Sequence, residues 1–283
     1  MTDRRFAATG RLLGQPALER LVRAHAVVAG MGGVGSWAAE ALVRTGVGTI
    51  TIIDLDHIAE SNVNRQVHAL ESTLGAAKVD VMGRRLHQIA PRADIRAIDA
   101  FVEPDNLEEL IPAQADVVVD AIDAVPAKAA LVAWCVQRGI AVVTCGAAGG
   151  RVDPLRLQCA DLARTSGDSL LASLRTRLRR RYGFPPAAGA TNRDLAHARR
   201  FGVPAIFSNE PRSGAGPSDG AVDGETGIGR GGAPLACAGY GSIVTVTGAM
   251  GFAAASRAID AILRRPLPPG KAARGVSPRR QDP

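Results

Sequence analysis

The stretch VVAGMGGVGS at residues 27–36 is the part of the sequence that decides the fold. Its first residues are apolar and mostly β-branched, which predicts a buried strand at 27–30. The glycines that follow predict a tight turn into a helix over 35–45. A turn of this kind can pack without a ligand, but its place between a strand and a helix favours binding of nucleotide phosphates. The candidate phosphate-binding residues are Gly30, Gly32, Gly33, Gly35 and Ser36.

Further apolar segments alternate with helical patterns along the first 150 residues. This alternation predicts an α/β fold with a doubly wound, mainly parallel Rossmann-like sheet. The expected strands are 27–30, 49–54, 94–99, 115–120 and 140–144. The expected helices are 12–24, 35–45, 75–90 and 126–138, with a basic helix at 170–182.

The composition divides the chain into four parts. We expect an N-terminal helical segment at 1–24, an ATP-binding Rossmann-like domain at 25–160, a C-terminal extension at 161–264 and a tail at 265–283. Residues 208–234 are rich in Gly, Ser and Pro, which predicts a mobile loop within the extension. The tail is rich in Pro, Gly and Arg and is expected to be disordered.

The charge balance is basic, at +7 with a pI of about 9.9. A basic chain favours polyanionic partners such as nucleic acid, although an arginine-rich proteome would give the same balance. The arginines of segment 175–200 are the candidate contacts, with a solvated helix face as the alternative. They are Arg175, Arg177, Arg179, Arg180, Arg181, Arg193, Arg199 and Arg200.

Two further features bear on where the protein works. The four cysteines form no C-x-x-C pair, and the first residues lack the apolar stretch of a secretory signal, so we expect a reducing cytoplasm. Residues 235–256 carry no charge and approach the length of a membrane span. Because they are rich in Gly, Ala, Ser and Thr, a buried helix or a subunit interface is favoured over membrane contact.

Acidic residues follow the second predicted strand. Asp54 ends that strand, about 20 residues after the glycine turn, where a ribose-binding acid is expected. Asp56 either contributes to the same site or only begins a turn. A dinucleotide dehydrogenase would share these features.

The next residues separate an ATP site from a hydride-transfer site. Segment 61–66 supplies Asn62, Arg65 and Gln66, and a guanidinium can hold phosphate oxygens in its fork. Lys78 adds a positive charge near the start of the next helix. Asp123 lies just past a strand end, where it can hold Mg²⁺ together with phosphates. Hydride transfer has no use for this set.

In order along 10–160, these motifs resemble the ThiF/MoeB family of ubiquitin-activating-type adenylating enzymes. The resemblance implies that the protein binds ATP and Mg²⁺ and activates a carboxylate. It implies phosphate binding by Gly32, Gly33 and Gly35 and ribose binding by Asp54. It implies phosphate contact or transition-state support by the catalytic residues Asn62, Arg65 and Lys78, with Mg²⁺ at Asp123, the fourth catalytic residue. It also implies a homodimer, in which Arg11 is the candidate arginine that reaches the partner's site.

Two departures point to a narrower branch. The chain lacks the paired zinc cysteines of sulfur-carrier enzymes, and Asp123-Ala124 replaces their Asp-Asn. Segments 5–14, 32–42, 64–70 and 120–131 resemble the tRNA threonylcarbamoyladenosine dehydratases, which implies ATP-dependent cyclisation of that nucleoside in tRNA. The alternatives are an adenylyltransferase for a ubiquitin-like sulfur carrier and a non-catalytic nucleotide-binding scaffold of a cysteine desulfurase system.

Overall fold

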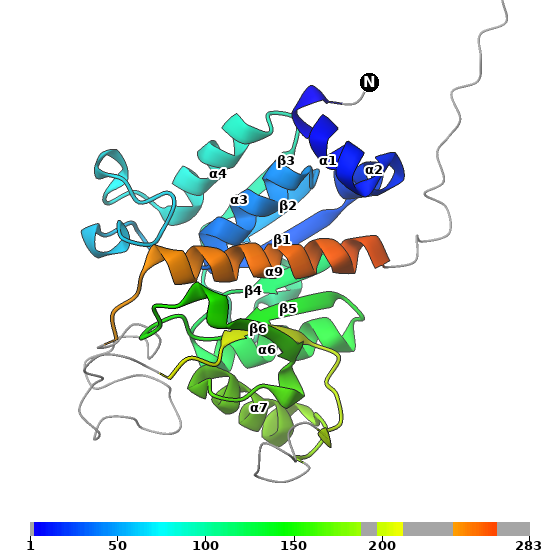
Figure 1. Cartoon of the computed structure of the whole chain (residues 1–283), viewed down its shortest axis with the longest axis vertical. Helices are drawn as coiled ribbons and strands as arrows, with labels where there is room; N and C mark the ends of the chain where they lie inside the picture. Colours follow the sequence, from blue (N-terminus) through cyan, green and yellow to red (C-terminus); the bar gives the residue numbers. More distant parts are fainter. Residues whose placement is uncertain (1–2, 188–196, 212–239, 265–283) are drawn as a thin grey trace, which may run out of the picture.

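The sheet of this protein has seven strands in the order β3-β2-β1-β4-β5-β7-β6. The computed structural model describes residues 3–187, 197–211 and 240–264 (Figure 1). All neighbouring strands are parallel except β6 and β7. The predicted doubly wound, mainly parallel α/β fold is therefore confirmed. The strands are β1 (His25–Ala29), β2 (Thr49–Ile53), β3 (Asp94–Ile98), β4 (Val117–Asp120), β5 (Ala141–Cys145), β6 (Leu157–Asp161) and β7 (Pro204–Ser208).

Helices cover both faces of the sheet. Side chains of β1 alternate between two cores: Ala26 and Val28 face one, and Val27 and Ala29 face the other. The first core is covered by α2 (Gln15–Arg23), α3 (Gly35–Thr45), α4 (Lys78–Ile89) and α9 (Val244–Arg264). The second is covered by α5 (Leu107–Leu110), α6 (Val125–Gln137) and α7 (Ser169–Tyr182). A short helix, α1 (Ala7–Leu13), precedes α2.

The strand order reverses between β1 and β4. From β1 the chain continues outward to β2 and β3 on one side, whereas β4 and β5 lie on the other. The last residues of the two central strands are neighbours, because Ala29 pairs with Asp120. In open sheets of this kind ligands bind beside the carboxyl ends at such a reversal.

The C-terminal half contributes more to the sheet than the sequence pattern indicated. Strand β6 spans the predicted domain boundary at 160, and β7 pairs with β5 inside the same sheet. The predicted loop at 208–234 starts too early, since Ser208 is a buried strand residue. The rest of that loop, from 212, and the tail at 265–283 lie outside the described residues, as do Arg193 and one of the four cysteines, Cys237.

The uncharged run at 235–256 enters a long helix that packs on the sheet. Helix α9 lies against α3 (Figure 1). Half of its most apolar stretch of 18 residues is buried. A Cβ added to Gly251 would lie 2.5 Å from the Val34 carbonyl oxygen. Small residues therefore allow the two helices to approach closely. By length and composition α9 also passes as a membrane span, a test that the core helices of soluble proteins also pass.

We predict that Gly251→Ala lowers the free energy of unfolding by about 1–3 kcal/mol, because overpacking forces α9 away from α3. The matched control is Gly83→Ala in α4, where the added Cβ would meet only Ala97 at 3.6 Å. That change should stabilise the helix by up to about 1 kcal/mol. Urea unfolding of both variants measures the difference, and equal effects would contradict the packing argument.

Candidate nucleotide-binding site

At two positions of the turn between β1 and α3, no residue larger than glycine fits. Gly30 has φ +92°, and a Cβ there would lie 2.8 Å from the Ala121 carbonyl oxygen. A Cβ on Gly35 would lie 1.8 Å from the Gly30 carbonyl oxygen. By contrast, a Cβ on Gly32 would meet no atom within 4 Å. The turn is closed against the protein and open at Gly32, in front of the N-terminus of α3, as phosphate binding requires.

Asp54 braces this turn. One of its carboxylate oxygens accepts a hydrogen bond from the Met31 N–H at 2.5 Å, and the other accepts one from the Asp56 N–H at 2.8 Å. Burial raises the pKa of Asp54 above its usual value. Each carboxylate oxygen has a second lone pair, so these bonds leave acceptor capacity for a ribose hydroxyl.

One side of the site brings together Lys78, Asp56 and Asp123. The Lys78 ammonium lies 2.7 Å from a carboxylate oxygen of Asp56. Lys78 is buried, whereas the Asp56 side chain is 56% exposed. Burial raises the pKa of Asp123, on which the charges of Asp56 and Lys78 also act. The structure thus brings together three residues that lie far apart in the sequence.

This edge fits a magnesium ion that is shared with phosphates. Among the described residues no three His, Cys, Asp or Glu side chains form a metal cluster. Mg²⁺ seldom needs such a cage, because one or two carboxylates and the phosphate oxygens usually hold it. Asp123 and Asp56 provide two such carboxylates.

The 61–66 segment folds back over the glycine turn. Arg65 donates to the Ser61 carbonyl at 2.6 Å and to the Asn64 side chain at 2.9 Å. A Cβ on Gly33 would lie 3.2 Å from the Arg65 Cγ, so the arginine stem covers the turn.

The polar side chains in and beside this segment include one that is hydrogen-bonded close by and two with buried atoms that have no hydrogen bond to any described residue. The Asn62 side chain accepts from the Ala59 N–H at 3.1 Å and so shapes the segment. Ser36 Oγ and Gln66 Oε1 are buried without a hydrogen-bond partner within 3–187, 197–211 and 240–264. Two unsatisfied polar atoms beside an open glycine turn are consistent with a polar ligand there.

Two predictions about arginines change with the structure. Arg175 is buried and donates to the Thr165 hydroxyl, so its prediction as a nucleic-acid contact is wrong. Arg179 also makes contacts within the protein, since it donates to the Pro185 carbonyl at 3.1 Å and lies over the Phe201 ring. The exposed arginines of this region are Arg180, Arg181, Arg199 and Arg200.

Arg11 lies near the amino ends of the strands, opposite the carboxyl ends where the site lies. It is exposed on α1, and α2 connects α1 to the amino end of β1, whereas the glycine turn follows the carboxyl end. The fold does not bring Arg11 into the site of its own chain. Its predicted role in a partner's site stays a prediction.

Sequence reasoning assigned no role to Lys128. Its ammonium lies 3.0 Å from a carboxylate oxygen of Asp120 and 2.9 Å from the Ile122 carbonyl, and both side chains of the ion pair are fully buried. The Thr144 hydroxyl donates to the same Asp120 oxygen at 2.6 Å. This ion pair holds the loop that carries Asp123. The only signal in the sequence was an aspartate at the end of a buried strand, which needs a buried partner.

A glycine turn bordered by Arg65, Lys78 and two carboxylates defines an α/β nucleotide-binding protein. Residues 5–276 match the ThiF family, and the chain belongs to this family. The motif resemblance is thereby confirmed.

Individual relatives cover nearly the whole chain. The tRNA threonylcarbamoyladenosine dehydratase of Escherichia coli K12 is 41% identical over 266 residues, which are 92% of this chain and 94% of the relative. That of Haemophilus influenzae is 39% identical over 264 residues, 93% and 95% of the two chains. The crystal structure of the E. coli dehydratase, TcdA, in complex with ATP has a TM-score of 0.76 at 39% identity, and covers 92% of this chain and 93% of that one.

We predict that Lys128→Met lowers the free energy of unfolding by about 3–5 kcal/mol at neutral pH, because it leaves the Asp120 carboxylate buried without its cation. The deficit should shrink as the pH falls, since burial already raises the pKa of Asp120 and protonation removes the uncompensated charge. The Asp120→Asn/Lys128→Met double variant should recover part of the loss. Urea unfolding from neutral to acid pH tests this, and a deficit that does not change with pH would contradict it.

Proposed function

We propose that this protein is a tRNA threonylcarbamoyladenosine dehydratase, which binds ATP and cyclises N6-threonylcarbamoyladenosine in tRNA with loss of water. The observation that carries the proposal is the extent of the match: 41% identity over 92% of this chain and 94% of a relative with that activity in its name. By comparison, the molybdopterin-synthase adenylyltransferase of Haemophilus influenzae is 34% identical over 117 residues, only 41% of this chain.

The site suits activation of a carboxylate. A carboxylate is a poor electrophile, and its conversion by ATP into an activated acyl group provides a good leaving group. The backbone of the turn at Gly32 would hold phosphates, while Arg65 and Lys78 would neutralise the charge that develops on them. Asp123, with Asp56 beside it, would hold Mg²⁺, which would add further positive charge against the phosphates.

The substrate itself supplies the nucleophile. In N6-threonylcarbamoyladenosine the carbamoyl group and the threonyl carboxylate belong to one modification, so ring closure is intramolecular. Such closure loses little translational and rotational entropy. The carbamoyl oxygen or nitrogen attacks the activated carbon and the carbamoyl group gives up an N–H proton. The oxygen lost from the carboxylate departs with the leaving group, so that one water is lost overall. Few side chains are needed beyond those that stabilise charge.

The proposal includes a place of action and partners. We expect a cytoplasmic homodimer in which Arg11 contributes to the partner's site. The exposed arginines of segment 175–200 would contact tRNA phosphates from the α7 face. Cysteine desulfurase or sulfur-acceptor proteins are further candidate partners, and contact of 235–256 with a membrane is the less favoured alternative to its packing on α3.

One assay decides between this activity and activation of a sulfur carrier. Purified protein, ATP, Mg²⁺ and tRNA with the threonylcarbamoyl modification are incubated, and the nucleosides are analysed by mass spectrometry after mild digestion. We expect the modified nucleoside to lose the mass of one water only when ATP is present. No change, together with ATP–pyrophosphate exchange that depends on a carrier ending in Gly-Gly, would establish the carrier activator instead. Nucleotide binding with neither reaction would point to the scaffold.

We predict that Arg65→Ala and Asp123→Ala each slow cyclisation by at least about 100-fold, because each removes charge stabilisation from the phosphate region. Both variants should keep the wild-type circular dichroism spectrum. The matched controls are Arg84→Ala and Asp80→Ala, which remove the same charges from exposed positions of α4. Single-turnover rates measure the effect, and wild-type rates in either site variant would remove that residue from the mechanism.

A further inference from the structure

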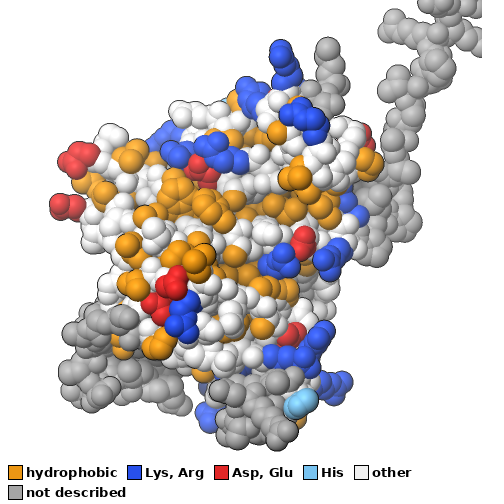
Figure 2. All heavy atoms as spheres, viewed as in Figure 1, with side chains coloured by type: hydrophobic (Ala, Val, Ile, Leu, Met, Phe, Trp, Pro, Cys, Tyr) orange, Lys and Arg blue, Asp and Glu red, His pale blue; other side chains and the backbone are white. Residues whose placement is uncertain are grey.

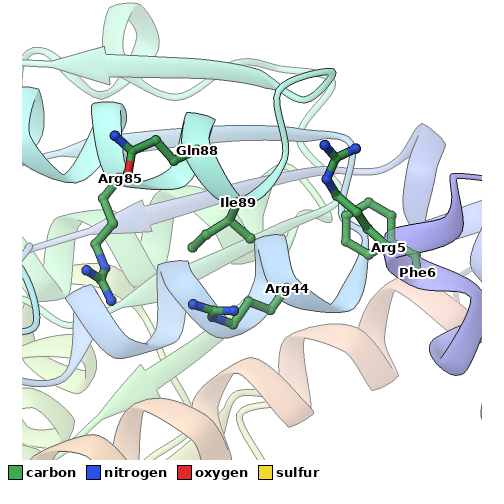
Figure 3. A pocket seen from close by; sticks show the side chains of 6 residues that line it. All are labelled: Arg5, Phe6, Arg44, Arg85, Gln88 and Ile89. Carbon is green, nitrogen blue, oxygen red and sulfur yellow. The ribbon is translucent and has the colours of Figure 1, made fainter.

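A second concave site lies between the N-terminal segment and the C-terminal ends of α3 and α4. It is a pocket of about 500 Å³ (Figure 3). Three arginine side chains border it, while Phe6 and Ile89 provide an apolar part of its wall. The lining residues are Arg5, Phe6, Arg44, Arg85, Gln88 and Ile89.

The pocket carries more positive than negative charge. Arg44 and Arg85 both donate to Glu40, at 2.8 and 2.5 Å, and Arg5 lies 3.1 Å from a carboxylate oxygen of Asp3. Burial raises the pKa of Glu40, but the two guanidinium groups outweigh burial and hold this pKa below its usual value. Each guanidinium has five N–H donors, so two carboxylates use only part of the donor capacity. Figure 2 shows basic side chains gathered at this end of the molecule.

The two helices that form the pocket also lead to the nucleotide site. Lys78 begins α4 and Arg85 follows it by seven residues, a rise of about 10 Å. Gly35 begins α3 and Arg44 follows it by nine residues, a rise of about 13 Å. Burial, with smaller effects from the charges of Lys78 and Arg85, lowers the pKa of His68 to about 4. The pocket therefore lies near the C-terminal ends of α3 and α4, about 10–13 Å along these helices from the proposed site of chemistry.

We propose that the pocket formed by Arg5, Arg44 and Arg85 binds a backbone phosphate of the tRNA, a few nucleotides from the modified adenosine. This inference rests on the proposed function and adds to it a second contact region for the substrate. Guanidinium groups match phosphate oxygens in a fork geometry. Phe6 and Ile89 offer apolar surface to the adjoining sugar or base. The exposed arginines of α7 lie on the other face of the sheet.

The test compares two double variants that change the net charge equally. Arg5→Gln/Arg44→Gln removes two pocket arginines and leaves Arg85 to pair with Glu40. The control, Arg96→Gln/Arg138→Gln, removes two exposed arginines that pair with Asp94 and Glu108 elsewhere on the surface. Filter binding measures the Kd of each protein for threonylcarbamoylated tRNA over a range of salt concentrations, and ATP binding is measured separately.

We expect the pocket variant to bind this tRNA roughly tenfold more weakly and to lower the salt slope of log Kd by about one, as loss of one phosphate contact requires. The control should change Kd less than about twofold, and ATP affinity should be unchanged in both. Equal weakening in the two variants would attribute binding to net charge alone and overturn the proposal. So would unchanged binding, or a shift in oligomeric state by sedimentation that accounts for the loss.

The proposed function can fail separately. If the wild-type protein binds the tRNA through this pocket but produces no ATP-dependent loss of water, the dehydratase proposal fails and the phosphate site stands. If the wild-type protein dehydrates the nucleoside and the pocket variant binds normally, the phosphate site fails and the dehydratase proposal stands.

Discussion

The close approach of the turn after β1 to the loop after β4 is the constraint on which the site depends. Only glycine fits at Gly30, against the Ala121 carbonyl, and at Gly35, against the Gly30 carbonyl. With both close contacts satisfied, α3 begins directly beside the central strands, and its N-terminus follows the open position at Gly32. A larger residue at either position would push the turn away from β4 and separate the two halves of the site.

Burial and charge then set the state of the residues around this turn. Asp54 and Asp123 both have raised pKa values, chiefly because burial disfavours the charged form. The backbone bonds to Asp54 and the Lys78 ammonium act against that effect. Bound phosphates would change this balance, since they compete with Asp56 for Lys78. The Lys78 ammonium pairs with Asp56 in this structure. It would pair with the phosphates once a nucleotide is bound.

Basic side chains lie on both faces of the sheet, an arrangement that suits a large polyanionic substrate. Exposed arginines of α7 lie on one face of the sheet, and the pocket of Arg5, Arg44 and Arg85 lies on the other, beside α4. The nucleotide site lies between these faces, at the carboxyl ends of the central strands β1 and β4. An extended nucleic acid can span both surfaces, whereas a small substrate can reach only the turn. Helix α9 adds a different constraint, because its packing on α3 holds the helix whose N-terminus faces the proposed phosphates.

Local pattern was enough to predict the parallel sheet, the glycine turn and the positions of Asp54, Arg65, Lys78 and Asp123 relative to strand ends. These features depend on residues close together in the sequence, because strand burial and turn conformation are local properties. The tertiary structure alone decided which distant segments meet. It placed Lys128 against Asp120, buried Arg175 and added β6 and β7 to the sheet. It also put Arg11 near the amino ends of the strands, away from the site. A periodic pattern reports how far a segment is buried, but it does not report the partner that buries it, and a charged side chain can be exposed, paired or buried with the same local sequence.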